Sequence, residues 1–266
     1  MFKYSILSSG SDGNAIYVES QKERLLIDAG LSGKKIENLL KSIDRTADNL
    51  TGILVSHEHR DHVQGVGVLA RRYQIPVFAN RPTWDAMMPI IKDIPSELKN
   101  EFALGTTKIF SDLDIESFGV SHDAVMPQFY RVHQNNHQFV VLTDTGYCSE
   151  RLVKTLKGAD AYLIETNHDV EMLRVGQKYS WDLKQRIMSD NGHLSNEDGA
   201  NAALEMIGAK TKRFYLGHRS QENNMRELAH EVMKQTLEEA GHDTSHKILL
   251  NDTFVEKATP LIAIDQ

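Results

Sequence analysis

The strongest chemical signal in the sequence is a cluster of metal-ligand residue types directly after an apolar run. Residues 53–55 predict a buried strand, and His57, His59, Asp61 and His62 follow it within a few positions. His57 and His59 are two residues apart, so in an extended segment they point to the same side and can hold one ion. Asp61 and His62 lie where the chain turns into a helix predicted over residues 63–73, and they can hold a second ion. Imidazole and carboxylate ligands without thiolate suit zinc, manganese or iron.

Three further candidate ligands each follow a predicted strand. They are His122, Asp144 and His218, and the strands are predicted at residues 115–120, 139–142 and 214–216. In α/β sheets, ligand-binding residues gather at the carboxyl ends of strands, so these three side chains can converge with the first cluster. Each of them alone is more simply explained as a turn residue or a hydrogen-bonding group. Together with the first cluster, they predict a site for two metal ions.

His193 is the candidate for proton transfer to a leaving group. It precedes Ser195, which together with Asp198 predicts the capped start of a helix. The positive end of the helix dipole disfavours a protonated imidazole nearby, so a carboxylate partner would help. Glu165 and Asp169 could both serve, and the sequence does not choose between them. A loop histidine that only hydrogen-bonds its neighbours is an equally good interpretation of His193.

The elements that must position these residues are short strands alternating with helices. Apolar and β-branched runs bounded by turn residues predict strands at 4–7, 15–18, 25–27, 53–55, 77–78, 115–120, 139–142, 162–164, 214–216 and 248–250. Helical spacing of apolar residues predicts helices at 63–73, 195–207 and 225–237. Strands and helices interleaved in this way indicate a layered α/β fold. No linker or repeat marks a boundary, and we therefore expect a single domain over residues 1–266.

Composition narrows the function classes. The chain carries 30 Lys and Arg against 37 Asp and Glu, a net charge of −7, so a basic footprint for nucleic acid over the whole surface is excluded. The single cysteine, Cys148, excludes an intrachain disulfide and a cysteine-rich metal site, and it favours a reducing, cytoplasmic setting. The N-terminal apolar stretch is too short for a signal peptide, and no segment approaches the ~18 apolar residues that a membrane span needs.

The ligand pattern resembles the metallo-β-lactamase superfamily, whose fold is a four-layer αββα sandwich with a dinuclear site along one edge. The resemblance assigns one metal to three imidazoles, those of His57, His59 and His122. It assigns the second metal to Asp61, His62 and His218, and it makes Asp144 the bridging ligand. Asp28 matches the first motif of the superfamily, which implies that it hydrogen-bonds the ligand loop and does not coordinate the metal itself.

Several longer segments resemble one group within the superfamily, the WalJ group, also called YycJ or VicX. The segments are residues 8–14, 121–124, 143–147, 165–173, 181–186, 192–197 and 217–224. This resemblance implies a 5′-to-3′ exonuclease acting on DNA, with RNase Z and RNase J as more distant relatives. It further implies that His193 is the general acid, and that the protein has a functional link to a cell-wall two-component regulatory system.

The expected reaction is hydrolysis of a phosphodiester by a hydroxide that bridges two divalent metal ions, Zn or Mn. Metal binding lowers the pKa of water from about 15.7 toward about 7, so hydroxide is available at neutral pH. Asp61, His193 and Glu165 are the candidate catalytic residues, and Arg219 and His168 are candidate substrate contacts, as are Lys184 and Arg186. A structural hydrogen-bonding role for His168 and a solvated face for Lys184 and Arg186 are the simpler interpretations. The net charge of −7 does not exclude a nuclease, because two bound divalent ions add positive charge where the phosphate must lie.

Two alternatives remain open. A hydrolase of small carbonyl substrates, such as lactones, thioesters or β-lactams, would use the same set of ligands. A regulatory partner of a two-component system without catalysis is a third interpretation. The complete ligand set counts against that third interpretation, since a binding module has no need of seven convergent metal ligands.

Overall fold

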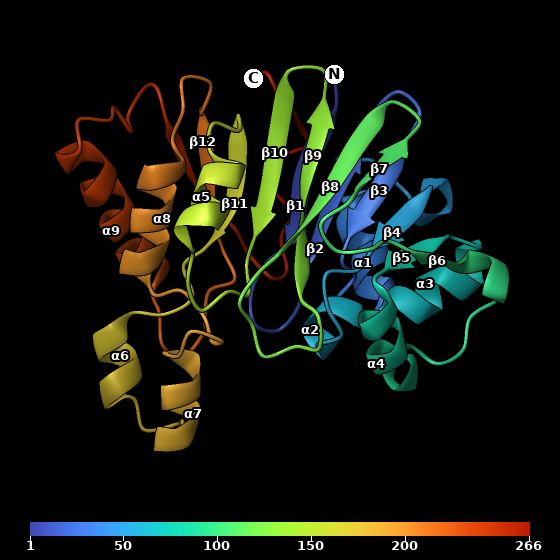
Figure 1. Cartoon of the computed structure of the whole chain (residues 1–266), viewed down its shortest axis with the longest axis horizontal. Coiled ribbons are helices and arrows are strands. Elements are labelled where there is room, and N and C mark those ends of the chain that lie inside the picture. The colour runs from blue at the N-terminus through green and yellow to red at the C-terminus, as the bar shows by residue number, and fades with distance from the viewer. The chain divides into compact units, whose positions relative to one another are not determined.

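A computed structural model describes all 266 residues of the chain, which divides into two compact units (Figure 1). The first unit contains Met1–Gly119, Ala124–Asn136 and Thr253–Gln266. The second unit contains Val120–Asp123 and His137–Asp252. Both units contain strands and helices. None of the helices has the length and apolar character needed to cross a lipid bilayer.

The first unit contains a seven-stranded sheet with the order β14-β1-β2-β3-β4-β5-β6. Its strands are β1 (Lys3–Ser8), β2 (Ala15–Glu19), β3 (Arg24–Ile27), β4 (Gly52–Leu54), β5 (Val77–Ala79), β6 (Lys99–Glu101) and β14 (Ile262–Ala263). Strands β14, β1, β2 and β3 pair antiparallel, whereas β3, β4, β5 and β6 run parallel. Because β3 and β4 are parallel neighbours, the loops that follow them leave from the same edge of the sheet.

Helices of the first unit bury their apolar faces against this sheet. They are α1 (Gly33–Lys41), α2 (Arg60–Val63), α3 (Val66–Tyr73) and α4 (Arg81–Ile91), with 3₁₀ turns at Ala47–Asn49 and Ser96–Leu98. Ile36 of α1 and Leu69 of α3 belong to one buried apolar cluster with Leu26 and Ile53 of the sheet. The sequence predicted a single helix over residues 63–73, and its start is wrong. The structure has two helices here, because the helical conformation is interrupted between Val63, where α2 ends, and Val66, where α3 begins.

A three-stranded antiparallel sheet segment completes the first unit. It consists of β7 (Thr107–Phe110), β8 (Leu113–Gly119) and β9 (Gln128–Gln134). The predicted strand at residues 115–120 corresponds to β8, whereas β7 and β9 were not predicted. Tyr130 of β9 is fully buried and donates a hydrogen bond of 2.7 Å to the carbonyl oxygen of Val55, which connects this segment to the end of β4.

The second unit contains four parallel strands in the order β13-β12-β11-β10. They are β10 (His137–Leu142), β11 (Ala161–Glu165), β12 (Arg213–Gly217) and β13 (Leu249–Asp252). The helices are α5 (Glu150–Leu156), α6 (Val170–Val175), α7 (Trp181–Ile187), α8 (Asn196–Met206) and α9 (Arg226–Glu239). The predicted cap of α8 is confirmed, since Oγ of Ser195 accepts a hydrogen bond from the backbone N–H of Asp198 at 3.0 Å. Because β10, β11 and β12 are parallel, their carboxyl ends meet at one edge.

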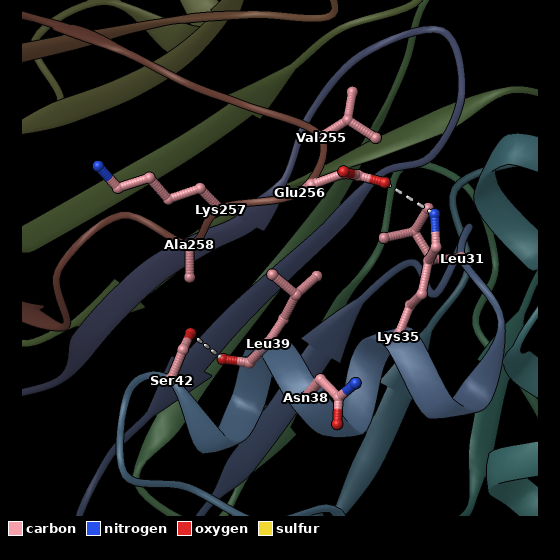
Figure 2. Close-up of a pocket in the computed structure, with 9 residues that line it drawn as sticks. All are labelled: Leu31, Lys35, Asn38, Leu39, Ser42, Val255, Glu256, Lys257 and Ala258. Carbon is pink, nitrogen blue, oxygen red and sulfur yellow. Dashed lines mark hydrogen bonds and ion pairs between the residues drawn. The ribbon is translucent and has the colours of Figure 1, made fainter.

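A groove of about 400 Å³ lies in the first unit between α1 and residues 255–258 (Figure 2). Leu31, Leu39 and Ala258 give it an apolar lining, and Nζ of Lys35 pairs with Oε1 of Glu256 at 3.0 Å across one end. None of the predicted metal ligands lines this groove. The groove is therefore distinct from the candidate metal centre.

Candidate metal centre

In the first unit, the loop between β4 and α2 carries His57 and His59 with their ring nitrogens facing each other. Nε2 of His57 lies 3.2 Å from Nδ1 of His59. The Oγ atom of Ser56 lies 2.9 Å from Nδ1 of His57, on the other side of that ring. His57 is fully buried. The two facing nitrogens are thus placed as two ligands of a single ion would be.

Asp28 supports this loop from the end of the neighbouring strand β3. Its Oδ1 atom accepts the backbone N–H of Ser56 at 2.8 Å, and its Oδ2 atom accepts the Ser56 hydroxyl at 2.7 Å. Oδ2 also lies 2.8 Å from Nδ1 of His62. A buried carboxylate that fixes one ring nitrogen leaves the other free for a metal. On that second side, Nε2 of His62 lies 3.3 Å from Oδ2 of Asp61.

Asn14 is a site residue that sequence reasoning did not find. Its Nδ2 atom lies 3.1 Å from Nε2 of His62 and 3.3 Å from Oδ2 of Asp61, and its backbone N–H donates to the Asp61 carbonyl at 2.8 Å. The backbone carbonyl of Asn14 accepts a hydrogen bond from the backbone N–H of Gly30. A Cβ added at Gly30 would lie only 1.5 Å from the carbonyl oxygen of Asp61. The signal in the sequence was that residues 8–14, which include Asn14, are one of the segments that resemble the WalJ group.

In the second unit, Asp144 and His218 are in direct contact. Oδ2 of Asp144, which follows β10, lies 2.7 Å from Nδ1 of His218, which follows β12. Both side chains are buried, and both residues adopt a left-handed backbone, with φ of 51° and 50°. Asp28 has the same conformation, with φ of 60°. This conformation costs residues with a Cβ on the order of 1–2 kcal/mol and is concentrated at functional sites.

Glu165, at the end of β11, is the carboxylate that partners His193. Its Oε1 atom lies 2.8 Å from Nδ1 of His193, and its Oε2 atom accepts the backbone N–H groups of Thr145 at 3.0 Å and Leu194 at 3.3 Å. Asp169, the other candidate, instead accepts the backbone N–H of Met172 at 2.7 Å and caps α6. The structure therefore chooses Glu165 between the two alternatives that the sequence left open.

These four side chains of the second unit form one cluster. The ligand-type atoms of Asp144, Glu165, His193 and His218 all lie within 4.8 Å of one another. Three of the four residues are buried, and His193 is the partly exposed member. A partly exposed imidazole at the edge of a buried cluster is accessible to a substrate and can exchange a proton with it.

His122 is oriented by a backbone carbonyl. Its Nδ1 atom lies 3.2 Å from the carbonyl oxygen of Gly192, and its Nε2 atom lies 3.4 Å from Oδ1 of Asp123 and 3.9 Å from Oδ1 of Asp144. Burial lowers the pKa of His122; the charge of Asp144 opposes this shift, and the neighbouring His193 adds to it. A neutral imidazole that donates from Nδ1 presents a lone pair at Nε2, as a metal ligand must.

Arg219 and His168, the candidate substrate contacts, are more buried than expected of residues that touch a substrate. Nη1 of Arg219 donates to the carbonyl oxygen of Leu216 at 2.9 Å and lies 3.4 Å from Oδ1 of Asp252, and burial lowers the pKa of this guanidinium. His168 is almost fully buried, and its Nδ1 atom has no hydrogen-bond partner. Burial lowers the pKa of His168 to about 4, so its ring is neutral at physiological pH.

Lys184 has a structural role in place of the expected phosphate contact. Its ammonium donates to the carbonyl oxygens of Arg174 at 2.8 Å and Gly176 at 2.5 Å, and the side chain is buried. These two carbonyls lie at the end of α6, so Lys184 connects α7 to α6. Arg186, its predicted companion, pairs with the carboxylate of Asp123.

The donor chemistry fits divalent metal ions. Each unit offers buried imidazole nitrogens together with carboxylate oxygens, and the positioning hydrogen bonds occupy the other ring nitrogen of His57, His62 and His122. Burial raises the pKa of the Cys148 thiol to about 12, so this residue offers no thiolate at neutral pH. The chain thus contains buried clusters of His and Asp that can hold metal ions.

Comparisons with known proteins agree with this chemistry. Residues 23–218 match the family described as the β-lactamase superfamily domain. Over 265 residues, the chain is 54% identical to exodeoxyribonuclease WalJ of Streptococcus pneumoniae serotype 2 (strain D39 / NCTC 7466), which covers 99% of this chain and 98% of that protein. Over 258 residues, it is 50% identical to exodeoxyribonuclease YycJ of Bacillus anthracis, with 97% of each chain covered.

Solved structures show the same fold. The metallo-β-lactamase fold protein YhfI from Bacillus subtilis superposes with a TM-score of 0.73 at 16% identity, over 97% of this chain and 98% of that chain. The predicted α/β fold of the metallo-β-lactamase type is confirmed. The chain belongs to the metallo-β-lactamase superfamily, in which it is a close homologue of the exodeoxyribonucleases WalJ and YycJ.

Proposed function

We propose that this protein is a metal-dependent exodeoxyribonuclease that hydrolyses phosphodiester bonds from the 5′ end of DNA. The observation that carries the proposal is the Glu165–His193 pair in contact with Asp144 and His218, in a chain that is 54% identical to a protein named as an exodeoxyribonuclease. A phosphodiesterase needs both a site for metal ions and a proton donor for the leaving oxygen. The second unit offers candidates for both.

In this proposal the metal ligands are those that the superfamily resemblance assigns. One ion would be held by His57, His59 and His122. The other would be held by Asp61, His62 and His218, and Asp144 would be shared between the two ions. Zinc and manganese are the candidate ions, because both accept imidazole and carboxylate ligands. When bound, such ions would supply an activated water and neutralise charge on the phosphate oxygens.

The residues around the ligands position them and move a proton. Asp28 fixes His62 and, through Ser56, the start of the ligand loop. Glu165 accepts from Nδ1 of His193, which leaves Nε2 as the atom that donates a proton to the leaving oxygen of the DNA. His122 is unsuited to that donation, since burial lowers its pKa and favours the neutral ring.

The test is an assay of metal-dependent hydrolysis on parallel substrates. The protein is treated with a chelator, restored with Mn²⁺ or Zn²⁺, and incubated with 5′-phosphorylated double-stranded DNA, single-stranded DNA, RNA and a nitrophenyl thioester. We expect release of nucleotides from DNA only after a metal is restored, and loss of that release in Asp144→Ala. Turnover of the thioester with no release of nucleotides would instead support the alternative hydrolase of small carbonyl substrates.

Three further properties stay predictions. A cytoplasmic location agrees with the single cysteine of the chain. A functional link to a two-component regulatory system follows from the resemblance to the WalJ group. The organisation of residues 1–266 as a single domain is expected because the predicted ligands are distributed from residue 57 to residue 218.

A further inference from the structure

The helices α6 and α7 form a hairpin whose two ends meet at the proposed catalytic pair. The hairpin occupies residues 166–192, directly between Glu165 and His193, whose side chains approach to 2.8 Å. In Figure 1 the two helices project beyond the end of α8 in the second unit. A ligand bound on this hairpin would therefore lie next to the site where the phosphodiester reacts.

Specific contacts attach the hairpin to the candidate site. The backbone N–H of His193 donates to the carbonyl of Ile187 at 2.9 Å, and the Gly192 carbonyl lies 3.2 Å from Nδ1 of His122. On the α6 side, the backbone N–H of Asp169 donates to the carbonyl of Asn223, in the loop that follows His218. The position of the hairpin is thus tied to three candidate site histidines.

The hairpin exposes apolar side chains that no helix covers. The Trp181 side chain, at the first position of α7, is 57% exposed, and Val175, at the end of α6, is 73% exposed. Trp84, the other tryptophan of the chain, is buried. Keeping an indole ring in water forgoes a large hydrophobic stabilisation, so an exposed ring on a hairpin that begins and ends at the site indicates a binding role.

The hairpin is less acidic than the chain as a whole. Over residues 166–192, it carries four basic residues (Arg174, Lys178, Lys184, Arg186) and four acidic ones (Asp169, Glu171, Asp182, Asp190), which gives 4 − 4 = 0. The chain as a whole has a net charge of −7. The exposed cations pair with Glu171, Glu222 and Asp123 at the surface. Such pairs are worth little, so phosphates can replace those carboxylates.

We propose that Trp181 stacks on a base of the DNA substrate, and that Arg174, Lys178 and Arg186 contact its backbone phosphates. The inference rests on the proposed function, because it presumes a DNA substrate. Aromatic rings combined with cations hold single-stranded nucleic acid without reading its sequence. Trp181 begins α7, about 10 Å along that helix from Ile187, whose carbonyl contacts His193. Trp181 would therefore hold unpaired nucleotides a short way along the strand from the scissile phosphate, and it would contribute to affinity more than to the chemical step.

The test uses the fluorescence of Trp181 in the metal-loaded protein. A Trp84→Phe background leaves Trp181 as the only indole, and the probe is a short 5′-phosphorylated oligothymidylate with phosphorothioate linkages, which resist hydrolysis. We expect saturable quenching of the Trp181 emission as the oligonucleotide binds. In an anisotropy titration with a labelled oligonucleotide, Trp181→Ala should weaken binding about tenfold or more, and Trp181→Phe should restore most of the affinity.

A matched control separates stacking from a general loss of apolar surface. Ile109 of β7 is 73% exposed and belongs neither to the hairpin nor to any cluster of candidate metal ligands, so Ile109→Ala should leave the affinity for the oligonucleotide unchanged. No quenching, together with an affinity of Trp181→Ala within twofold of the parent, would overturn the inference. A concentration-dependent dimer in light scattering that Trp181→Ala abolishes would also overturn it, since the surface would then bind a second copy of the chain.

Failure of this inference can be distinguished from failure of the proposed function. The metal-loaded parent protein is assayed on DNA and on bis(p-nitrophenyl) phosphate, which has no base to stack. If the proposed function fails, the parent does not hydrolyse DNA, whether or not it hydrolyses the small ester. If only the stacking inference fails, the parent hydrolyses DNA, and Trp181→Ala loses no more activity on DNA than on the small ester. We expect the loss on DNA to exceed any loss on the small ester by about tenfold or more.

Discussion

Oε1 of Glu165 lies 2.8 Å from Nδ1 of His193 and 3.7 Å from Nδ1 of His218, so one fully buried carboxylate faces two imidazoles. Its second oxygen accepts two backbone N–H groups, from Thr145 and Leu194. A carboxylate without such partners would be strongly disfavoured in this interior. Glu165 therefore sets the orientation of the proposed proton donor and also joins the loop after β10 to the segment before α8.

Removal of the Glu165 charge should impair catalysis more than folding. Glu165→Gln keeps the shape of the side chain but removes the negative charge and one of its two acceptor oxygens. Its NH2 group must then face either Nδ1 of His193 or the N–H groups of Thr145 and Leu194, which are all donors to Glu165. We expect the DNA hydrolysis rate to fall about 10²-fold or more, as when a general acid is lost. The matched control is Asp169→Asn, which retains an N-cap oxygen on α6 and should keep the parental rate. A Glu165→Gln protein with the parental rate would exclude the proposed role of this pair.

His193→Gln should discriminate between substrates by their leaving groups. A deoxyribose hydroxyl is a poor leaving group that needs a proton, whereas nitrophenolate leaves without one. We expect DNA hydrolysis to fall about 10²-fold or more while hydrolysis of p-nitrophenyl thymidine 5′-phosphate falls much less. Steady-state rates on the two substrates measure this difference. Equal losses on both substrates would mean that His193 does not protonate the leaving group.

Substitution of Asp28 should weaken metal binding through the ligands that it holds. Asp28 contacts Ser56 and His62, and outer carboxylates of this kind typically contribute 10- to 100-fold in metal affinity. We expect Asp28→Asn to lower the zinc affinity within that range. A competition titration against a chromophoric chelator gives the affinity. An unchanged affinity, with the fold intact by circular dichroism, would show that His62 keeps its orientation without this carboxylate.

Gly30 should tolerate no side chain. A Cβ at this position would lie 1.5 Å from the carbonyl oxygen of Asp61, and both groups belong to backbone that cannot move without displacing Asn14. We expect Gly30→Ala to lower the free energy of unfolding by about 3 kcal/mol or to shift the ligand loop and lose metal. Urea unfolding and metal content check both outcomes. Gly119→Ala is the control, since its nearest neighbour would be an ordinary contact at 3.5 Å.

Glu19 should make the first unit sensitive to acid. Burial acts to raise the pKa of Glu19, but hydrogen bonds from Arg45 at 2.5 Å and Tyr17 at 2.9 Å outweigh it and lower the pKa. The stabilisation is therefore complete above the unfolded-state value of 4.5 and is lost as the pH falls through the folded-state value. Urea unfolding at pH 7, 5 and 4 should show a smaller acid loss in Glu19→Gln than in the parent. Equal acid losses in the two proteins would contradict the assignment.

Apolar runs in the sequence predicted those strands that contain such runs. Every strand predicted from an apolar run is present, and most of these runs are buried, although Leu249 of β13 is 37% exposed. Strand β6, with the sequence Lys-Asn-Glu, has no such run, and β9 carries polar residues at several positions. These strands form because a neighbouring strand supplies hydrogen-bond partners, which is a property of the tertiary structure.

The sequence by itself determined the chemistry of the site: the residues from His57 to His62 are close in the chain, so their types and spacing alone indicated a metal site. Only the tertiary structure decided which distant side chains meet. It chose Glu165 over Asp169, brought Asn14 to His62, and turned Lys184 inward onto carbonyl groups. The physical reason is that each contact depends on where the chain folds back: Glu165 ends a parallel strand, Asn14 lies in the loop between β1 and β2, and Lys184 of α7 reaches the end of α6. Local residue types and spacing do not specify such pairings.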